Sequence, residues 1–166
     1  MVQRISLLFY IVFIFWAINA DATSNLTSEE KWSKAYHRYQ NLYKNSFYLH
    51  HPERVKWMEA VNACSEEGSH LVVVNSQAES EVISKFMTTN SITAIFAGFH
   101  DMFFEGEYIT ITGQTLEEAG FSTWHVREPD EESSGVNQDC GVVFYDGRIG
   151  DLVCEHNVTF ICEYEM

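Results

Sequence analysis

Apolar residues recur at helical spacing in the middle of the chain and predict one amphipathic helix, and a capping signal after it predicts a second helix. The first runs from Val55 to Glu67 and ends before Gly68, because its apolar positions share one face and glycine commonly follows a helix end. The second begins after Ser76 and reaches about residue 87, since Ser76 followed by Glu79 has the pattern of a capping box. No further helix is predicted beyond it.

A helix is also predicted near the start of the chain, where aromatic residues recur along one side of a segment that begins at Ser28. These residues are Trp32, Tyr36, Tyr39 and Tyr43. An aromatic stripe packs on a core more often than it binds a ligand, so we assign this one no function.

Short apolar runs predict strands on both sides of a long polar loop. The predicted strands cover residues 47–50, ending at 51–53, and then 71–74, 95–99, 108–112, 140–145 and 159–163. Asp146-Gly147 predicts a hairpin turn. The acidic segment 115–137 is long for a connection within a compact domain, so we expect it to be functional or disordered. Early helices followed by strands around a long loop predict an α+β fold.

The first residues have the pattern of a secretory signal peptide. A short basic stretch up to Arg4 precedes an uncharged run from Ile5 to Ile18 and then small residues at Ala20 and Ala22. A membrane anchor is the alternative, but a spanning helix needs about 20 apolar residues and this run is shorter. We expect a secreted, extracellular protein with a signal peptide at 1–22, an amino-terminal extension at 23–46 and one domain at 47–166.

Cysteine usage agrees with secretion. The chain has four cysteines, Cys64, Cys140, Cys154 and Cys162, and an even number in an oxidising compartment predicts two disulfides. Four cysteines allow three pairings. Zinc ligation is the alternative, but no two of them form a C-x-x-C pair. Glycosylation sequons at Asn25 and Asn157 fit the same route.

The charge excludes some partners. The formal net charge is −14, which argues against nucleic acid as a ligand. An anionic target would have to be reached through a bridging cation, local basic residues or neutral sugars. Most acids are expected to form a solvated surface. The exceptions are those clustered between Asp101 and Asp151.

Catalytic patterns are missing from the sequence, so we expect no enzyme. It has no H-x-x-x-H pair, no G-x-S-x-G and no cysteine left over as a nucleophile once disulfides form. A glycosidase that pairs Glu128 with another acid of the loop is the remaining enzymatic alternative.

Several short motifs, taken in order, resemble the C-type lectin domain family from about residue 47 to 163, and specifically the secreted single-domain lectins of insect haemolymph. They are Trp57-Met58-Glu59-Ala60 before Cys64, the segment 67–76, Phe96 to Asp101, Glu105-Gly106-Glu107-Tyr108, Trp124 before Glu128-Pro129-Asp130, Gln138-Asp139-Cys140, Gly147 to Asp151, and Phe160 to Glu163. The order and the cysteine spacing make the match specific.

The resemblance implies a C-type lectin-like fold, in which two helices pack on short antiparallel sheets beside a long calcium-binding loop. It implies disulfides Cys64–Cys162 and Cys140–Cys154, and a cis bond before Pro129. It also places a principal calcium and sugar site at Glu128, Asp130, Gln138 and Asp151, and an accessory calcium site at Asp101, Glu105, Glu131 and Asp139. Calcium takes six to eight oxygen ligands, which suits an oxygen-rich loop.

The loop departs from the family pattern in three places. Asp130 stands where mannose-type relatives have asparagine, although Glu128 is the mannose-type residue. Gly150 supplies no side-chain oxygen, and Gln138 has no charge. Glu131, Glu132 or Asn137 could replace the lost ligand. The alternatives are a loop that binds no metal and an accessory cluster that is only surface charge.

Two functional hypotheses follow. One is a calcium-dependent lectin of innate immunity that recognises microbial surface glycans or lipopolysaccharide. The other is a calcium-independent module that keeps the fold and binds a protein partner.

Overall fold

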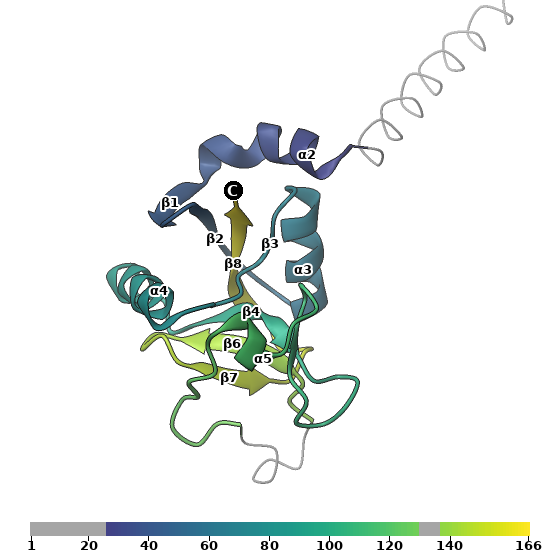
Figure 1. Cartoon of the computed structure of the whole chain (residues 1–166), viewed down its shortest axis with the longest axis vertical. Coiled ribbons are helices and arrows are strands. Elements are labelled where there is room, and N and C mark those ends of the chain that lie inside the picture. The colour runs from purple at the N-terminus through teal and green to yellow at the C-terminus, as the bar shows by residue number, and fades with distance from the viewer. Residues whose placement is uncertain (1–25, 130–136) are drawn as a thin grey trace, which may run out of the picture.

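The computed structural model describes residues 26–129 and 137–166 (Figure 1). The predicted signal peptide and Asn25, Asp130 and Glu131 therefore lie outside the described residues. In the described ranges, four α-helices surround one mixed sheet of eight strands. None of these helices has both the length and the apolar character needed to cross a bilayer.

The sheet is built around β8 (Val158–Glu165), which pairs with β2 (Ser46–Val55) on one side and β4 (Ala94–His100) on the other. Beyond β2 lies β1 (Gln40–Tyr43), and beyond β4 lie β6 (Cys140–Phe144) and β7 (Ile149–Leu152). Short strands β3 (His70–Leu71) and β5 (Ile109–Thr110) pair with β8 and β4. The predicted antiparallel pairing holds except for β4 and β8, which run parallel.

Successive side chains of the strands point alternately into two apolar cores, one on each face of the sheet. Ile161 of β8 faces the core under α4 (Gln77–Thr89), and the next residue towards the start of the strand, Phe160, faces the core under α3 (Trp57–Glu66). Figure 1 shows these two helices on opposite sides of the strands. Because strand side chains alternate between faces, the two predicted helices can each cover one face. The predicted α+β class is confirmed.

Both predicted disulfides are present. Cys64 of α3 joins Cys162 of β8, and Cys140 of β6 joins Cys154 after β7. The first attaches a helix to the central strand. The second closes the base of the β6–β7 hairpin, whose turn contains Asp146-Gly147 as predicted.

The amino-terminal helix ends earlier than its aromatic pattern predicted. Helix α2 (Ser28–Ala35) ends in a 3-10 turn (Tyr36–Arg38), and the chain then enters β1. Tyr39 leaves the helical stripe because its hydroxyl bonds to Glu67 and Ser69. Trp32 packs on the core as expected, with its ring stacked 3.8 Å from that of Tyr164.

Three other local predictions need correction. Strand β2 continues through Pro52, where its register with β8 shifts, and so does not end at residues 51–53. The segment 72–74 is buried but forms no regular strand. A short helix, α5 (Leu116–Ala119), lies in the loop expected to lack helices; Thr115 and Glu118 form its capping box, a signal present in the sequence.

Candidate functional site

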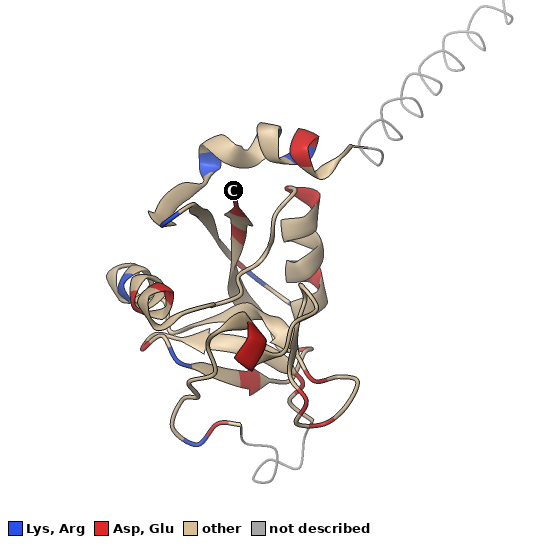
Figure 2. Ribbon diagram, viewed as in Figure 1, with Lys and Arg blue, Asp and Glu red and all other residues tan. Residues whose placement is uncertain are grey.

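Strand pairing brings acidic residues from three distant segments to one end of the sheet. His100, the last residue of β4, pairs with Cys140, the first residue of β6, and Cys140 pairs with Leu152 on β7. Asp101 therefore leaves the sheet beside Asp139 and Asp151. Figure 2 shows acidic positions on β7 and on the loop that follows β4.

Asp151 is fully buried and only partly satisfied. Its Oδ2 accepts a hydrogen bond from the hydroxyl of Tyr108, and its backbone N–H lies 3.5 Å from Oε2 of Glu128. Its Oδ1 has no hydrogen-bond partner among the described residues. A buried carboxylate oxygen without a partner is costly, so this atom is available to a cation.

Asp101, directly after the end of β4, repeats the same pattern. The residue is only 1% exposed, and its Oδ2 accepts a hydrogen bond from the backbone N–H of Gly106 at 2.8 Å. Its Oδ1 also finds no hydrogen-bond partner in the described part of the chain. The backbone N–H of Asp101 donates to the carbonyl of Asp139 at 3.2 Å, which ties the loop after β4 to the end of the long loop.

Burial and then mutual repulsion raise the pKa values of two of these acids. Burial raises the pKa of Asp101, and the negative charges of Asp139 and Asp151 raise it further against the opposing hydrogen bond from a backbone amide. The pKa of Glu105 is also raised, by desolvation and then by the same set of neighbouring carboxylates. A divalent cation would relieve this repulsion, so the residues fit a calcium site.

Glu128 occupies the space beside Gly150. A Cβ placed on Gly150 would lie 2.9 Å and 3.1 Å from Cγ and Cδ of Glu128 and 2.5 Å from Cε2 of Phe144. The glycine that departs from the family pattern therefore makes room for the Glu128 side chain. The Glu128-Pro129 bond is cis, as the resemblance implied.

The other predicted ligands are divided between described and undescribed segments. Gln138 is half-buried and Glu105 is exposed, whereas Asp130 and Glu131 lie in 130–136, outside the described ranges. Asn137, considered as a replacement ligand, donates its amide N–H groups to both carboxylate oxygens of Asp139 at 3.0 Å. It thus serves Asp139 as a donor.

Comparison with known proteins agrees with this geometry. The sequence profile described as Lectin C-type domain matches residues 53–164. The chain belongs to the C-type lectin domain family. Because this family consists of carbohydrate-binding domains that are not enzymes, the prediction of no catalytic activity is confirmed.

Two curated relatives and one solved structure show how far the likeness extends. The chain is 39% identical over 127 residues to hemolymph lipopolysaccharide-binding protein of Periplaneta americana, covering 72% of this chain and 49% of that protein. It is 32% identical over 115 residues to lectin BRA-3 of Megabalanus rosa, covering 66% of this chain and 65% of that one. The chain thus spans about half the length of the first relative and 65% of the second. The carbohydrate-recognition domain of mouse scavenger receptor C-type lectin superposes with a TM-score of 0.68 at 27% identity, covering 77% of this chain and 95% of that domain.

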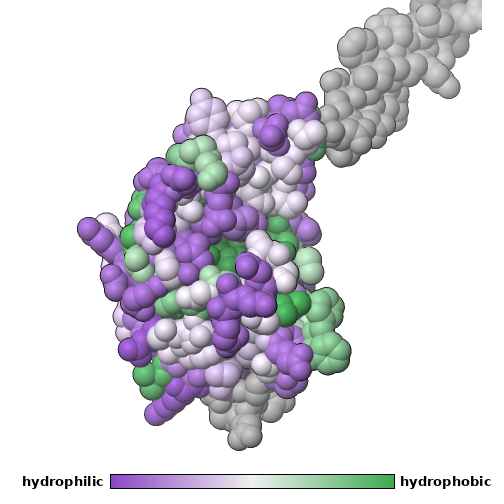
Figure 3. Space-filling view, in the orientation of Figure 1, coloured by the Kyte–Doolittle hydropathy of each residue, from purple (hydrophilic) through white to green (hydrophobic). Residues whose placement is uncertain are grey.

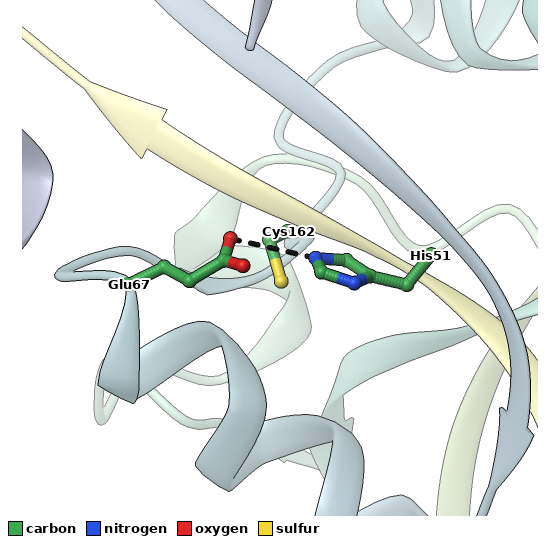
Figure 4. A group of neighbouring side chains, drawn as sticks. All are labelled: His51, Glu67 and Cys162. Atoms are coloured by element: carbon green, nitrogen blue, oxygen red, sulfur yellow. Dashed lines mark ion pairs between the residues drawn. The ribbon is translucent and has the colours of Figure 1, made fainter. Parts of the chain in front are cut away.

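One residue group that the sequence did not indicate has the spacing of metal ligands in the described part of the chain. His51, Glu67 and Cys162 place ligand atoms within 4.8 Å of one another (Figure 4). The sulfur of Cys162 is in a disulfide, so it offers no thiolate. His51 stacks on Phe160 with ring centres 4.5 Å apart and lies 3.4 Å from a carboxylate oxygen of Glu67, so we assign this group a structural role.

The tryptophans act mainly as anchors in the lectin domain. Trp57 is 2% exposed, and its indole N–H donates to the carbonyl of Ala97 at 2.8 Å. Trp124 packs against Tyr108, with ring centres 4.7 Å apart, and lines a hollow of about 490 Å³ together with Pro129. The hollow lies beside Tyr108, the residue that holds Asp151, and so adjoins the candidate site.

Proposed function

We propose that this protein is a secreted lectin of innate immunity that binds microbial surface glycans, including lipopolysaccharide, through calcium. The principal ion would be held by Glu128, Asp130, Gln138 and Asp151. The observation that carries the proposal is the orphaned Oδ1 of Asp151, fully buried next to Glu128. Family membership and a relative named for binding lipopolysaccharide support the ligand class.

The bound ion would supply the coordination of two neighbouring sugar hydroxyls. The chain's own task is to hold carboxylate oxygens in place around it and to accept hydrogen bonds from those hydroxyls. Tyr108 fixes Oδ2 of Asp151 and thereby directs the other oxygen away from the hydroxyl. Glu128 extends over Gly150 towards the same strand, which brings its carboxylate next to Asp151.

An accessory calcium is proposed at Asp101, Glu105, Asp139 and Glu131. Its support is the second orphaned oxygen, Oδ1 of Asp101, and the raised pKa values of Asp101 and Glu105 that follow from burial and crowded carboxylates. This ion would fasten the loop after β4 to the end of the long loop, which the backbone hydrogen bond from Asp101 to Asp139 already joins.

Secretion remains part of the proposal. The signal-peptide pattern and the two disulfides support it. Of the two sequons, Asn157 is exposed just before β8 and so is accessible to glycosylation, whereas Asn25 lies outside the described residues.

The test is calcium-dependent binding of the mature chain to immobilised lipopolysaccharide and to a glycan array. We expect binding in millimolar calcium and none in chelator. Asp151→Asn should abolish it, because the neutral amide is a poorer calcium ligand, while Glu29→Gln on exposed α2 should bind as wild type does. Binding that survives both chelator and Asp151→Asn would refute the calcium mechanism.

The second candidate function, a calcium-independent module that binds a protein, is favoured by one observation. The side chain of Glu128 fills the place where a ligand side chain at position 150 would stand. Chelator-insensitive binding of a protein, with no glycan signal on the array, would select this candidate.

A further inference from the structure

The loop that follows β4 carries three consecutive exposed apolar side chains. Met102, Phe103 and Phe104 are 41%, 70% and 70% exposed, and we call them the apolar tip. The other large exposed apolar residues of the described chain are scattered singly along the sequence. Figure 3 shows apolar atoms protruding at the edge of the molecule where this loop lies.

The apolar tip sits on a braced turn. The backbone N–H of Phe104 donates to the carbonyl of Asp101 at 3.0 Å, and that of Glu107 donates to the carbonyl of Phe104 at 2.9 Å. The ring of Phe103 meets the edge of His100, with centres 5.2 Å apart, and His100 in turn contacts buried Trp57. The structure therefore keeps these aromatic side chains exposed to solvent and not packed on the core, and the largest exposed apolar patch of a protein is often functional.

Negative charge around the apolar tip limits which surfaces it can approach. Asp101 precedes it, and Glu105 and Glu107 follow it, so carboxylates surround its base. They would repel the phosphate groups of a lipid surface in the absence of a cation. Calcium at Asp101 and Glu105, as proposed above, would cancel most of this charge and could take a phosphate oxygen as a further ligand, and the aromatic side chains would reach the acyl chains.

The size of the tip favours lipid over a protein partner. Two phenylalanines at this exposure offer roughly 200 to 350 Å² of apolar area. A stable protein interface buries about 800 Å² on each partner. Two aromatic rings are enough for insertion at a membrane interface, where each buried apolar group adds affinity independently of shape matching.

We infer that Met102, Phe103 and Phe104 insert among the acyl chains of an anionic glycolipid surface while calcium at Asp101 and Glu105 binds the phosphate of its headgroup. This inference rests on the proposed function for the calcium and names the ligand more closely. The protein would then bind glycolipid in a membrane more tightly than the same sugar free in solution.

The test compares two probes and three forms of the mature chain. The probes are phosphatidylcholine vesicles containing lipid A, which lacks the polysaccharide, and delipidated polysaccharide from the same lipopolysaccharide. The forms are wild type, Phe103→Ser/Phe104→Ser, and Met166→Ser, which removes an equally exposed apolar side chain at the end of β8. In millimolar calcium, the double variant should lose at least about tenfold in vesicle affinity, whereas Met166→Ser should lose none.

The outcomes distinguish failure of the acyl-chain inference from failure of the proposed glycan function. Unchanged binding of the polysaccharide by the double variant supports an acyl-chain role, and an equal loss on both probes overturns it in favour of a sugar contact. Vesicle binding unaffected by Phe103→Ser/Phe104→Ser also overturns it, as does a wild-type dimer that the variant converts to monomer. Absence of polysaccharide binding by wild type is a failure of the proposed glycan function, and the vesicle comparison stands apart from it.

Discussion

The hydroxyl of Tyr48 on β2 donates a hydrogen bond to the carboxylate of Glu79 on α4, in the core between the helix and the sheet. The second oxygen of Glu79 accepts the backbone N–H of Asn75 at 2.7 Å. Glu163 of β8 is equally buried nearby, and its Oε1 has no hydrogen-bond partner among the described residues. Burial and the charge of Glu79 raise the pKa of Glu163 to about 9, so Glu163 is protonated at neutral pH.

This buried acid predicts how stability changes with pH. The ordinary pKa of Glu163 is 4.5 and its folded pKa is about 9, so between these values the folded protein holds a proton that the unfolded chain has released. Stability contributed by this group therefore falls as pH rises through that window. Glu163→Gln should flatten the fall, measured by urea unfolding at about pH 5 and about pH 8.5. Glu165→Gln, an exposed neighbour on the same strand, is the control, and equal slopes for wild type and Glu163→Gln would contradict the prediction.

Calcium should stabilise the fold, since an ion that binds only the native loops shifts the unfolding equilibrium by mass action. At a hundredfold excess over Kd the gain is about 2.7 kcal/mol, which corresponds to a rise in Tm of roughly 5 to 10 °C. In chelator, Asp151→Asn should melt at or above the wild-type temperature, because it removes a buried charge and keeps a side-chain oxygen for Tyr108. Differential scanning calorimetry with and without calcium measures both effects. A wild-type Tm that calcium does not move would rule out a calcium site that matters for stability.

The two disulfides should differ in their contribution to stability. Cys64–Cys162 spans 98 residues and Cys140–Cys154 spans 14, so loop entropy gives about 4.7 and about 3 kcal/mol. We expect Cys64→Ala/Cys162→Ala to lower the free energy of unfolding more than Cys140→Ala/Cys154→Ala does. Denaturant titration in chelator tests the order, and the reverse order would show that the chain-entropy argument fails here.

The shorter disulfide should instead matter more for calcium. Asp151 lies on β7, between the position that pairs with Cys140 and the turn of the hairpin. Removing Cys140–Cys154 frees that strand end, so the calcium-induced rise in Tm should shrink more than it does without Cys64–Cys162. Equal shrinkage would mean that the hairpin holds Asp151 without the disulfide.

Local signals predicted the parts of the fold that depend on local physics. Helix α3 follows from apolar periodicity and α4 from its capping signal, and both end within two residues of the predicted limits. The disulfide pairing came from the family resemblance, because spacing alone left three possibilities.

Long-range contacts explain what local patterns missed. Tyr39 and Tyr43 keep helical spacing with Trp32, but both leave the helix. Tyr39 bonds to Glu67 and Ser69, and Tyr43 lies in β1, which pairs with β2. Ser76 caps α4 as predicted, yet Glu79 turns away from the capping box to reach Asn75 and Tyr48. In both cases the contacts that win include a partner distant in sequence, which for Glu79 is Tyr48, and they outweigh a local preference of about 1 kcal/mol.

At the site, the sequence identified residue types but not their packing. In the sequence, Gly150 indicated that a calcium ligand had been lost. In the structure, the missing side chain at this position leaves the space that the Glu128 side chain fills. The orphaned oxygens of Asp101 and Asp151 could not be foreseen, since they depend on which atoms Gly106 and Tyr108 engage.

Gly150→Asn gives the last prediction, because sequence and structure expect opposite results. The family pattern suggests that asparagine would restore a missing ligand and tighten calcium binding. In the structure, even its Cβ would lie 2.5 Å from the ring of Phe144 and 2.9 Å from Cγ of Glu128, so Glu128 must move out of the site. We therefore expect Gly150→Asn to weaken calcium binding in calorimetry and to cost about 1 to 3 kcal/mol of stability from overpacking.

The double variant Gly150→Asn/Phe144→Leu separates crowding from ligand chemistry. A smaller side chain at position 144 removes the closest clash, so residue 150 can shift its Cβ towards the ring's former place and Glu128 can return beside Asp151. Calcium affinity should then recover to the wild-type level or beyond. Phe144→Leu alone is the control for lost packing against His125, whose ring centre lies 4.6 Å from that of Phe144. If the single variant Gly150→Asn already binds calcium more tightly than wild type at unchanged stability, then the position of Glu128 over Gly150 is not what sets the calcium affinity of this loop.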